Sequence, residues 1–240
     1  MLHTIQKNGL LASLPPHELG LLAFGMKEAE FQSGVTLQEA GEAIDRIYFP
    51  HDGLVSLQVA TRDGGCVEVG IVGREGAVGL IRGHDRPLAS TRAVVHIGGR
   101  FSVVPGEKFE RACQESPVLR DMLLRESERL CMQAQQIAAC NAGHSTEARL
   151  ARWLLQRTDL IGEDGGIPAT QEFLAQIFCV RRTTITLIAH EMQTAGLIKY
   201  RRGLVRVLDR EGLRERSCEC YEAVSPRLPY IEEAPASISG

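Results

Sequence analysis

Hydrophobic positions in the first third of the chain fall in short runs that are separated by turn residues. Within each run apolar and polar residues partly alternate, which is the pattern of half-buried strands. The runs are 46–49, 54–59, 66–72, 91–97 and 101–104. Many short strands punctuated by glycine predict a compact barrel or jelly roll. A helix is expected before them, because Pro15 and Pro16 suit a first helical turn.

The pattern changes over residues 105–158, where glycine is scarce and the helix formers Leu, Arg, Glu, Ala and Gln dominate. Ser116 can cap a long helix that Pro117 begins. Gly143 can end that helix, and Ser145 or Thr146 can cap the next one. The sequence therefore predicts a long helix over 117–143.

One stripe of the long helix has a heptad spacing. Leu123, Leu130 and Ile137 recur every seven residues, whereas the intermediate seam positions Glu126 and Gln133 are polar. Such an imperfect heptad suits a short dimer contact. The alternative is a helix face that packs on its own domain, and we favour the dimer.

A pair of helices is predicted in residues 169–195. Thr170 can cap a short first helix, and Cys179 stands at the tight turn after it. Apolar residues at spacings of three and four give each helix one buried face. They are Leu174 and Phe178 on the first helix, and Ile185, Ile188 and Met192 on the second. This is the geometry of a helix-turn-helix.

Residues 198–208 predict a hairpin with a basic turn around Gly203, which is the position of a wing. In this motif the start of the second helix reaches base edges, and arginine can bond guanine O6 and N7 together. We expect base contacts from Arg181, Arg182 and Thr186. The residues expected to contact phosphate are Thr170, Gln171, Thr183, Arg201 and Arg202. Thr184 lies in the same first turns and completes the candidate DNA-binding set, for which the alternative is a merely solvated basic surface.

Composition limits the other functions. The 240 residues carry a net charge of −3, so a nucleic-acid role must rest on a local basic patch. No signal peptide or apolar run of about 20 residues is evident, which predicts a cytoplasmic protein that does not span a membrane. No nucleophile–base pair stands out, and the glycine-rich segment 73–79 matches neither a Walker loop nor a dinucleotide fingerprint. We therefore expect no enzymatic activity.

The seven cysteines are odd in number and lack a secretion signal, so reduced thiols are expected. Cys218 and Cys220 form a close-spaced pair. A Cys-x-Cys pair without further ligands nearby is weak evidence for a metal. We interpret it as structural or incidental and expect no metal and no cofactor.

Three segments resemble the family of the cyclic-AMP receptor protein and FNR, the Crp–Fnr regulators. They are 173–186, 195–198 and 207–213, with weaker similarity over about 10–225. The resemblance implies an α+β chain with an N-terminal β-roll sensor, a long dimerisation helix and a C-terminal winged helix-turn-helix. It also implies a homodimer that binds double-stranded DNA at an inverted repeat, with half-sites roughly 34–36 Å apart, and RNA polymerase as a partner.

The departures from the family pattern concern both the DNA site and the sensor. Arg182 replaces the glutamate of the best-known recognition helices, so a different half-site is expected, because arginine cannot accept a hydrogen bond from cytosine N4. In the sensor, Ala77 stands at the position of the carboxylate that holds the ribose, and Ala89 at that of the phosphate arginine. Conventional control by cyclic AMP is therefore not expected.

The cysteines and histidines of the sensor region limit the other sensor types. An iron–sulfur centre of the oxygen-responsive kind needs an N-terminal cysteine cluster, whereas the first cysteine here is Cys66. A haem sensor stays open, with His51, His84 and His96 in the sensor region. A ligand- or protein-binding module with a degenerate helix-turn-helix is a further alternative, which the paired arginines and the basic wing disfavour.

The resulting division of the chain has four parts. We expect a sensor over 1–116, a dimerisation helix over 117–143, a DNA-binding domain over 144–225 and a flexible tail over 226–240.

Overall fold

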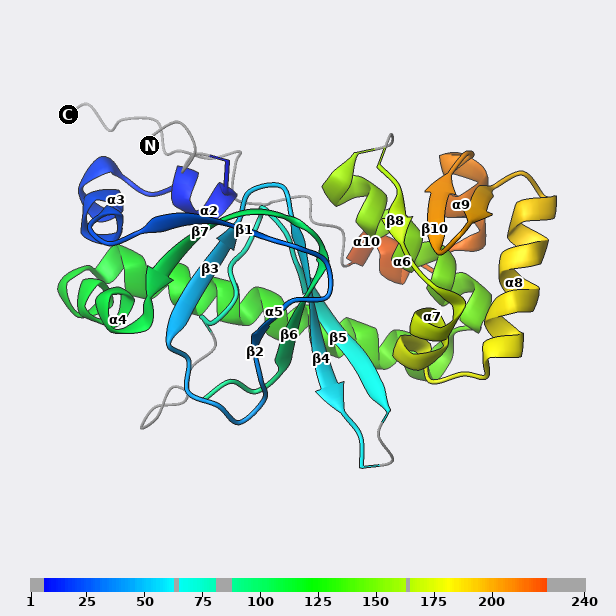
Figure 1. Cartoon of the computed structure of the whole chain (residues 1–240), viewed down its shortest axis with the longest axis horizontal. Coiled ribbons are helices and arrows are strands. Elements are labelled where there is room, and N and C mark those ends of the chain that lie inside the picture. Colours follow the sequence, from blue (N-terminus) through cyan, green and yellow to red (C-terminus); the bar gives the residue numbers. More distant parts are fainter. Residues whose placement is uncertain (1–6, 63–64, 81–87, 163–164, 224–240) are drawn as a thin grey trace, which may run out of the picture.

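The computed structural model describes residues 7–62, 65–80, 88–162 and 165–223. It has a β-rich N-terminal part, one long helix that runs along this part, and a C-terminal part of helices with a small sheet (Figure 1). The predicted α+β class is confirmed. Within the described ranges no helix combines the length and the apolar character needed to cross a bilayer. The predicted tail over 226–240 and His84 lie outside the described residues.

The N-terminal part is a roll of two antiparallel sheets with strand orders β1-β7-β3 and β2-β6-β4-β5. Its strands are β1 (Lys27–Phe31), β2 (Thr36–Gln38), β3 (Arg46–Pro50), β4 (Leu54–Ala60), β5 (Cys66–Val72), β6 (Arg92–Ile97) and β7 (Gly99–Pro105). Its helices are α2 (Gly9–Ala12), α3 (Pro16–Ala23) and α4 (Gly106–Glu115). All five predicted strands are present. The sequence pattern missed β1 because the strand is short and three of its five residues are charged and exposed.

The long helix α5 (Pro117–Gly143) occupies the range that the sequence predicted. Ser116 caps it, since its side chain accepts a hydrogen bond from the Leu119 amide at 3.3 Å. The next helix, α6 (Thr146–Ile161), begins in the same way with Ser145. Both boundaries therefore follow from local capping chemistry.

The interpretation of the heptad stripe of α5 as a dimer seam was wrong. Leu130 packs in a hydrophobic cluster of the chain's own sensor, and Ile137 is also buried within the single chain. The polar seam residues hydrogen-bond the same sensor. Gln133 accepts from the Ile71 amide at 2.9 Å, and Glu126 accepts from the Ala77 amide at 3.2 Å. The polar residues therefore satisfy buried backbone donors that an apolar seam would leave unpaired.

The C-terminal part has its own hydrophobic core. After α6 its elements are β8 (Ile167–Pro168), α7 (Gln171–Phe178), α8 (Arg182–Thr194), β9 (Ile198–Arg201), β10 (Leu204–Val207), α9 (Arg210–Arg216) and α10 (Cys220–Ala223). The three strands form a sheet with the order β8-β10-β9. Figure 1 shows α8 at the end of the molecule farthest from the β-roll.

A buried ion pair joins the two parts. Arg157 on α6 is completely buried, and its Nη2 atom lies 2.8 and 2.6 Å from the two carboxylate oxygens of Glu68 on β5. The same carboxylate accepts from Trp153 Nε1 at 3.0 Å and from Ser56 Oγ at 2.6 Å. Burial lowers the pKa of Arg157 to about 10, which still leaves it charged at neutral pH. The DNA-side helix α6 is thereby fixed to the sensor sheet.

Candidate nucleic-acid interface

The predicted helix-turn-helix is formed by α7 and α8. Thr170 caps α7, with its Oγ1 accepting from the Phe173 amide at 3.1 Å. The helix ends at Cys179, whose φ of 52° places it in the left-handed region. This conformation turns the chain sharply, and α8 begins at Arg182. The cap and the turn residue that the sequence predicted are both confirmed.

Packing determines which face of α8 is presented outward. The apolar stripe of Ile185, Ile188 and Met192 is buried in the C-terminal core together with Leu174 and Phe178 of α7. The opposite face is therefore left exposed. Its exposed residues are Arg182, Thr183, Thr186, Leu187 and His190, with Arg181 exposed just before the helix.

The wing is a hairpin of β9 and β10 joined by two residues. Arg201 pairs with Leu204 in the ladder, and Arg202 and Gly203 between them have φ values of 52° and 75°. Two positive φ angles are the signature of a type I′ turn, which glycine favours at its second position. Exposed Arg202 is thus held at the tip of the wing.

An open groove lies between the start of α7, the start of α8 and the wing. It is lined by Thr170, Gln171, Glu172, Arg182, Tyr200, Arg202 and Gly203. Tyr200 donates from its hydroxyl to the Ala169 carbonyl at 2.6 Å and so fixes the wing against α7. Burial raises the pKa of Tyr200, so it stays a neutral donor at physiological pH. Four predicted DNA contacts, Thr170, Gln171, Arg182 and Arg202, meet in this groove.

The arginines at the start of α8 and in the wing can bind a negatively charged ligand. Within the described ranges, Arg181, Arg182, Arg201 and Arg202 take part in no ion pair. Glu172 is the acidic residue of the groove. The surface that carries these arginines is therefore suited to a polyanion whose charges are spaced along a backbone.

Two of the candidate DNA-contact residues, Thr186 and Gln171, are hydrogen-bonded to each other. Thr186 donates from Oγ1 to Gln171 Oε1 at 2.8 Å and lies 3.0 Å from the Arg182 carbonyl. This contact ties the start of α7 to the second turn of α8. Thr184 is only half exposed, whereas Thr183 is fully exposed. Thr186 thus has a positioning contact that the sequence did not reveal.

Sequence reasoning missed Leu187 and His190. Leu187 is 58% exposed on the outer face of α8, and His190 lies one turn further along. An exposed leucine on this face can contact a thymine methyl group, and a histidine can donate to a phosphate or a base. The signal was present in the helix period, since both follow Thr183 at spacings of four and seven.

Comparison with known proteins identifies this arrangement. A family model of the Crp-like helix-turn-helix domain matches residues 148–216, which span α7, α8 and the wing. The chain therefore carries a Crp-like helix-turn-helix domain in its C-terminal part. It is a DNA-binding transcription regulator. No curated protein matches it in sequence.

Solved structures of Crp–Fnr regulators share the whole fold. FixK2 from Bradyrhizobium japonicum is 14% identical with a TM-score of 0.69, and the match covers 80% of this chain and 98% of FixK2. TTHA1359, a CRP/FNR regulator from Thermus thermophilus, is 21% identical with a TM-score of 0.62, over 80% and 98%. The c-di-GMP responsive regulator CLP from Xanthomonas campestris is 13% identical with a TM-score of 0.63, over 80% and 99%.

Proposed function

We propose that this Crp–Fnr regulator binds an inverted repeat as a homodimer, with one α8 in the major groove of each half-site. The observation that supports this most is the exposed α8 face, which has exposed arginines at its N-terminal end and a basic wing tip beside it. In a winged helix-turn-helix the recognition helix reads bases and the wing holds the backbone. RNA polymerase is the proposed partner at promoters.

Arg181→Ala is expected to weaken binding to a specific site by about 1–3 kcal/mol and to relax the preference at one base pair. The reason is that a bidentate contact to guanine depends on the base, whereas a phosphate contact does not. The measurement is fluorescence anisotropy on a specific duplex and on a random duplex at one salt concentration. Arg202→Ala at the wing tip is the matched control, and it should weaken both duplexes equally. Equal losses for Arg181→Ala on both duplexes would exclude base reading by this residue.

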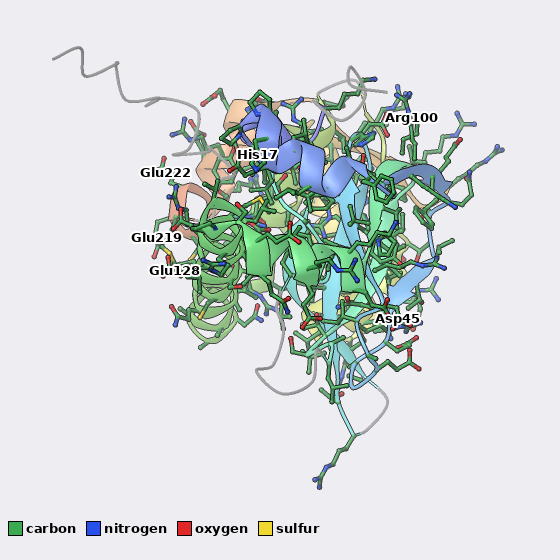
Figure 2. The ribbon with its side chains drawn as sticks, turned by 90° about the vertical axis from the view of Figure 1, so that its left-hand side faces the viewer. His17, Asp45, Arg100, Glu128, Glu219 and Glu222 are labelled. Atoms are coloured by element: carbon green, nitrogen blue, oxygen red, sulfur yellow. The ribbon has the colours of Figure 1, made fainter. Side chains whose placement is uncertain are left out.

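We propose that the outward face of α5 supplies the dimer contact in place of the buried stripe. Leu124 and Met132 are 60% and 67% exposed there. Glu128 projects from the same side, away from the β-roll (Figure 2). Large apolar side chains exposed on one helix face are typical of an interface.

Met132→Asp is expected to weaken the dimer by about 10–100-fold, because burying such a side chain is worth about 1.5–3 kcal/mol. Sedimentation equilibrium over a range of concentrations measures the effect. The control is Leu208→Asp, which changes a residue 60% exposed outside α5 and should leave the dimer unchanged. A dimer of undiminished strength in Met132→Asp would place the interface elsewhere.

We also propose that cyclic AMP does not control this protein in the usual way. Ala77 and Ala89 are buried and pack in a hydrophobic cluster. The cavity beside Ala77 has about 10 Å³ of space, which is the room for one water molecule. His51 and His96 are also buried, His51 in contact with Ser102 Oγ at 2.9 Å. Isothermal titration with cyclic AMP is expected to give no heat of specific binding.

A further inference from the structure

Four metal-ligating side chains meet where α5, α6 and the C-terminal segment join. Cys140 lies in the last turn of α5 and His144 is its C-cap residue, while Cys218 and Cys220 precede and begin α10. One ligand atom from each of the four lies within 4.8 Å of all the others. Cys140 and Cys218 are 78 positions apart, so the fold supplies the further ligands that the Cys-x-Cys pattern lacked.

The distances fit ligands around a single ion. Cys140 Sγ lies 3.5 Å from Cys218 Sγ, and Cys220 Sγ lies 3.6 Å from His144 Nδ1. A tetrahedral zinc ion, with Zn–S bonds of about 2.3 Å and Zn–N bonds of about 2.0–2.1 Å, sets sulfur atoms about 3.8 Å apart and sulfur and nitrogen about 3.6 Å apart. Both printed contacts lie within about 0.3 Å of these values.

The environment of the three cysteines differs from that of an ordinary hydrophobic core. Buried cysteines usually pack as small hydrophobic residues among larger ones. Here the buried cluster consists of Cys140, Cys218 and Cys220, with Ala148 as the partly buried hydrophobic residue against it. Three thiols therefore face one another and an imidazole rather than an apolar wall.

Hydrogen bonds with neighbouring residues orient two of the four ligands. His144 Nε2 lies 3.1 Å from Glu219 Oε1, so Nδ1 is the nitrogen that faces the thiols. Gln136 donates from Nε2 to Cys220 Sγ at 2.9 Å. A carboxylate on the far nitrogen of a histidine and a donor on a sulfur are the usual second contacts of a metal site. Glu219 itself projects at the surface of the molecule (Figure 2).

We propose that Cys140, His144, Cys218 and Cys220 bind one Zn²⁺ ion per chain. Three sulfur ligands and one imidazole in a closed tetrahedral set are typical of structural zinc, whereas Mg²⁺ and Ca²⁺ require oxygen ligands. An iron–sulfur cluster distributes its ligands over several iron atoms, so it does not suit ligand atoms this close together. The ion fastens the end of the DNA-binding part to the junction between α5 and α6.

The test is the metal content of the full chain, purified under reducing conditions and measured by plasma mass spectrometry. We expect about one zinc per chain, and Co²⁺ substitution should give the absorption bands of a tetrahedral cobalt–thiolate site. Cys218→Ser and Cys220→Ser should each lower the zinc content at least tenfold. Cys131→Ser, which changes an exposed cysteine on α5, is the matched control and should retain the full content.

A second variant keeps the test decisive where a cysteine variant fails to fold. Glu219→Gln changes a surface side chain and should weaken zinc affinity by about 10–100-fold in a competition with a chromogenic chelator. Zinc content near zero in the unmodified chain, iron with acid-labile sulfide, or a Cys140–Cys218 disulfide in protein alkylated at lysis would each overturn the proposal. None of these outcomes bears on DNA binding, which is measured separately.

Discussion

Glu68→Ala is expected to lower the free energy of unfolding by about 3–5 kcal/mol. The substitution leaves the Arg157 guanidinium charged and completely buried without its carboxylate. Arg157 Nε already lacks a hydrogen-bond partner within the described ranges. The guanidinium also contacts the Trp153 carbonyl at 3.4 Å and the Trp153 ring, but neither group carries the negative charge that would replace the carboxylate. Trp153 Nε1 and Ser56 Oγ lose their acceptor as well.

Urea unfolding of both proteins at pH 7.5, followed by circular dichroism, measures the difference. The matched control is Glu222→Ala, which breaks an exposed ion pair with Arg214 and should cost no more than about 1 kcal/mol. The double variant Glu68→Leu with Arg157→Met should recover most of the loss, because it removes both buried charges. A loss below about 1 kcal/mol for Glu68→Ala would mean that the two parts do not meet through this pair.

Acidification is expected to weaken the contact between the sensor and the helix-turn-helix through His96. His96 on β6 stacks on Phe173 of α7 at 5.0 Å between ring centroids and meets the Trp153 ring edge-on. Burial, and then the charge of Arg157, lowers the pKa of His96 to about 2. Since the folded pKa lies below the unfolded value of about 6.5, the unfolded chain takes up a proton first. The stability is complete above about pH 6.5 and falls by about 1.4 kcal/mol per pH unit below it.

His96→Phe removes this proton and retains an aromatic ring against Phe173. His96 Nε2 has no hydrogen-bond partner in the described part of the chain, so the substitution breaks no bond at that atom. Unfolding free energies of both proteins at pH 7.5 and pH 5 give the comparison. The original chain should lose about 2 kcal/mol more than the variant between the two pH values. Equal losses would show that His96 is already protonated or accessible in the folded state.

Local chemistry explains what the sequence could predict. The helix-turn-helix rests on Thr170, Cys179 and the apolar spacing of α8, which are all visible within a few residues. The heptad of α5 identified the residues that share a face but not what covers it. Glu126 and Gln133 are paired with backbone amides 49 and 62 positions away, and no periodicity reports such contacts.

Long-range partners account for the other differences. Glu68 and Arg157 are 89 positions apart, and the pattern of a strand with one charged residue does not reveal a buried ion pair. The cysteines show the same limit, because His144 and Cys220 approach only when α10 folds back onto the end of α5. The DNA contacts predicted on the outer face of α8 were charged and hydroxyl residues. The exposed Leu187 on the same face was therefore not among them.

Selection of tight sites from a pool of random duplexes, with purified protein and no added ligand, tests the central proposal most directly. We expect an inverted repeat with half-sites about one helical turn apart, which should be lost when both Arg181 and Arg182 are replaced by alanine. Binding to random DNA that persists at low salt, with no sequence recovered, would contradict sequence-specific reading by this face of α8.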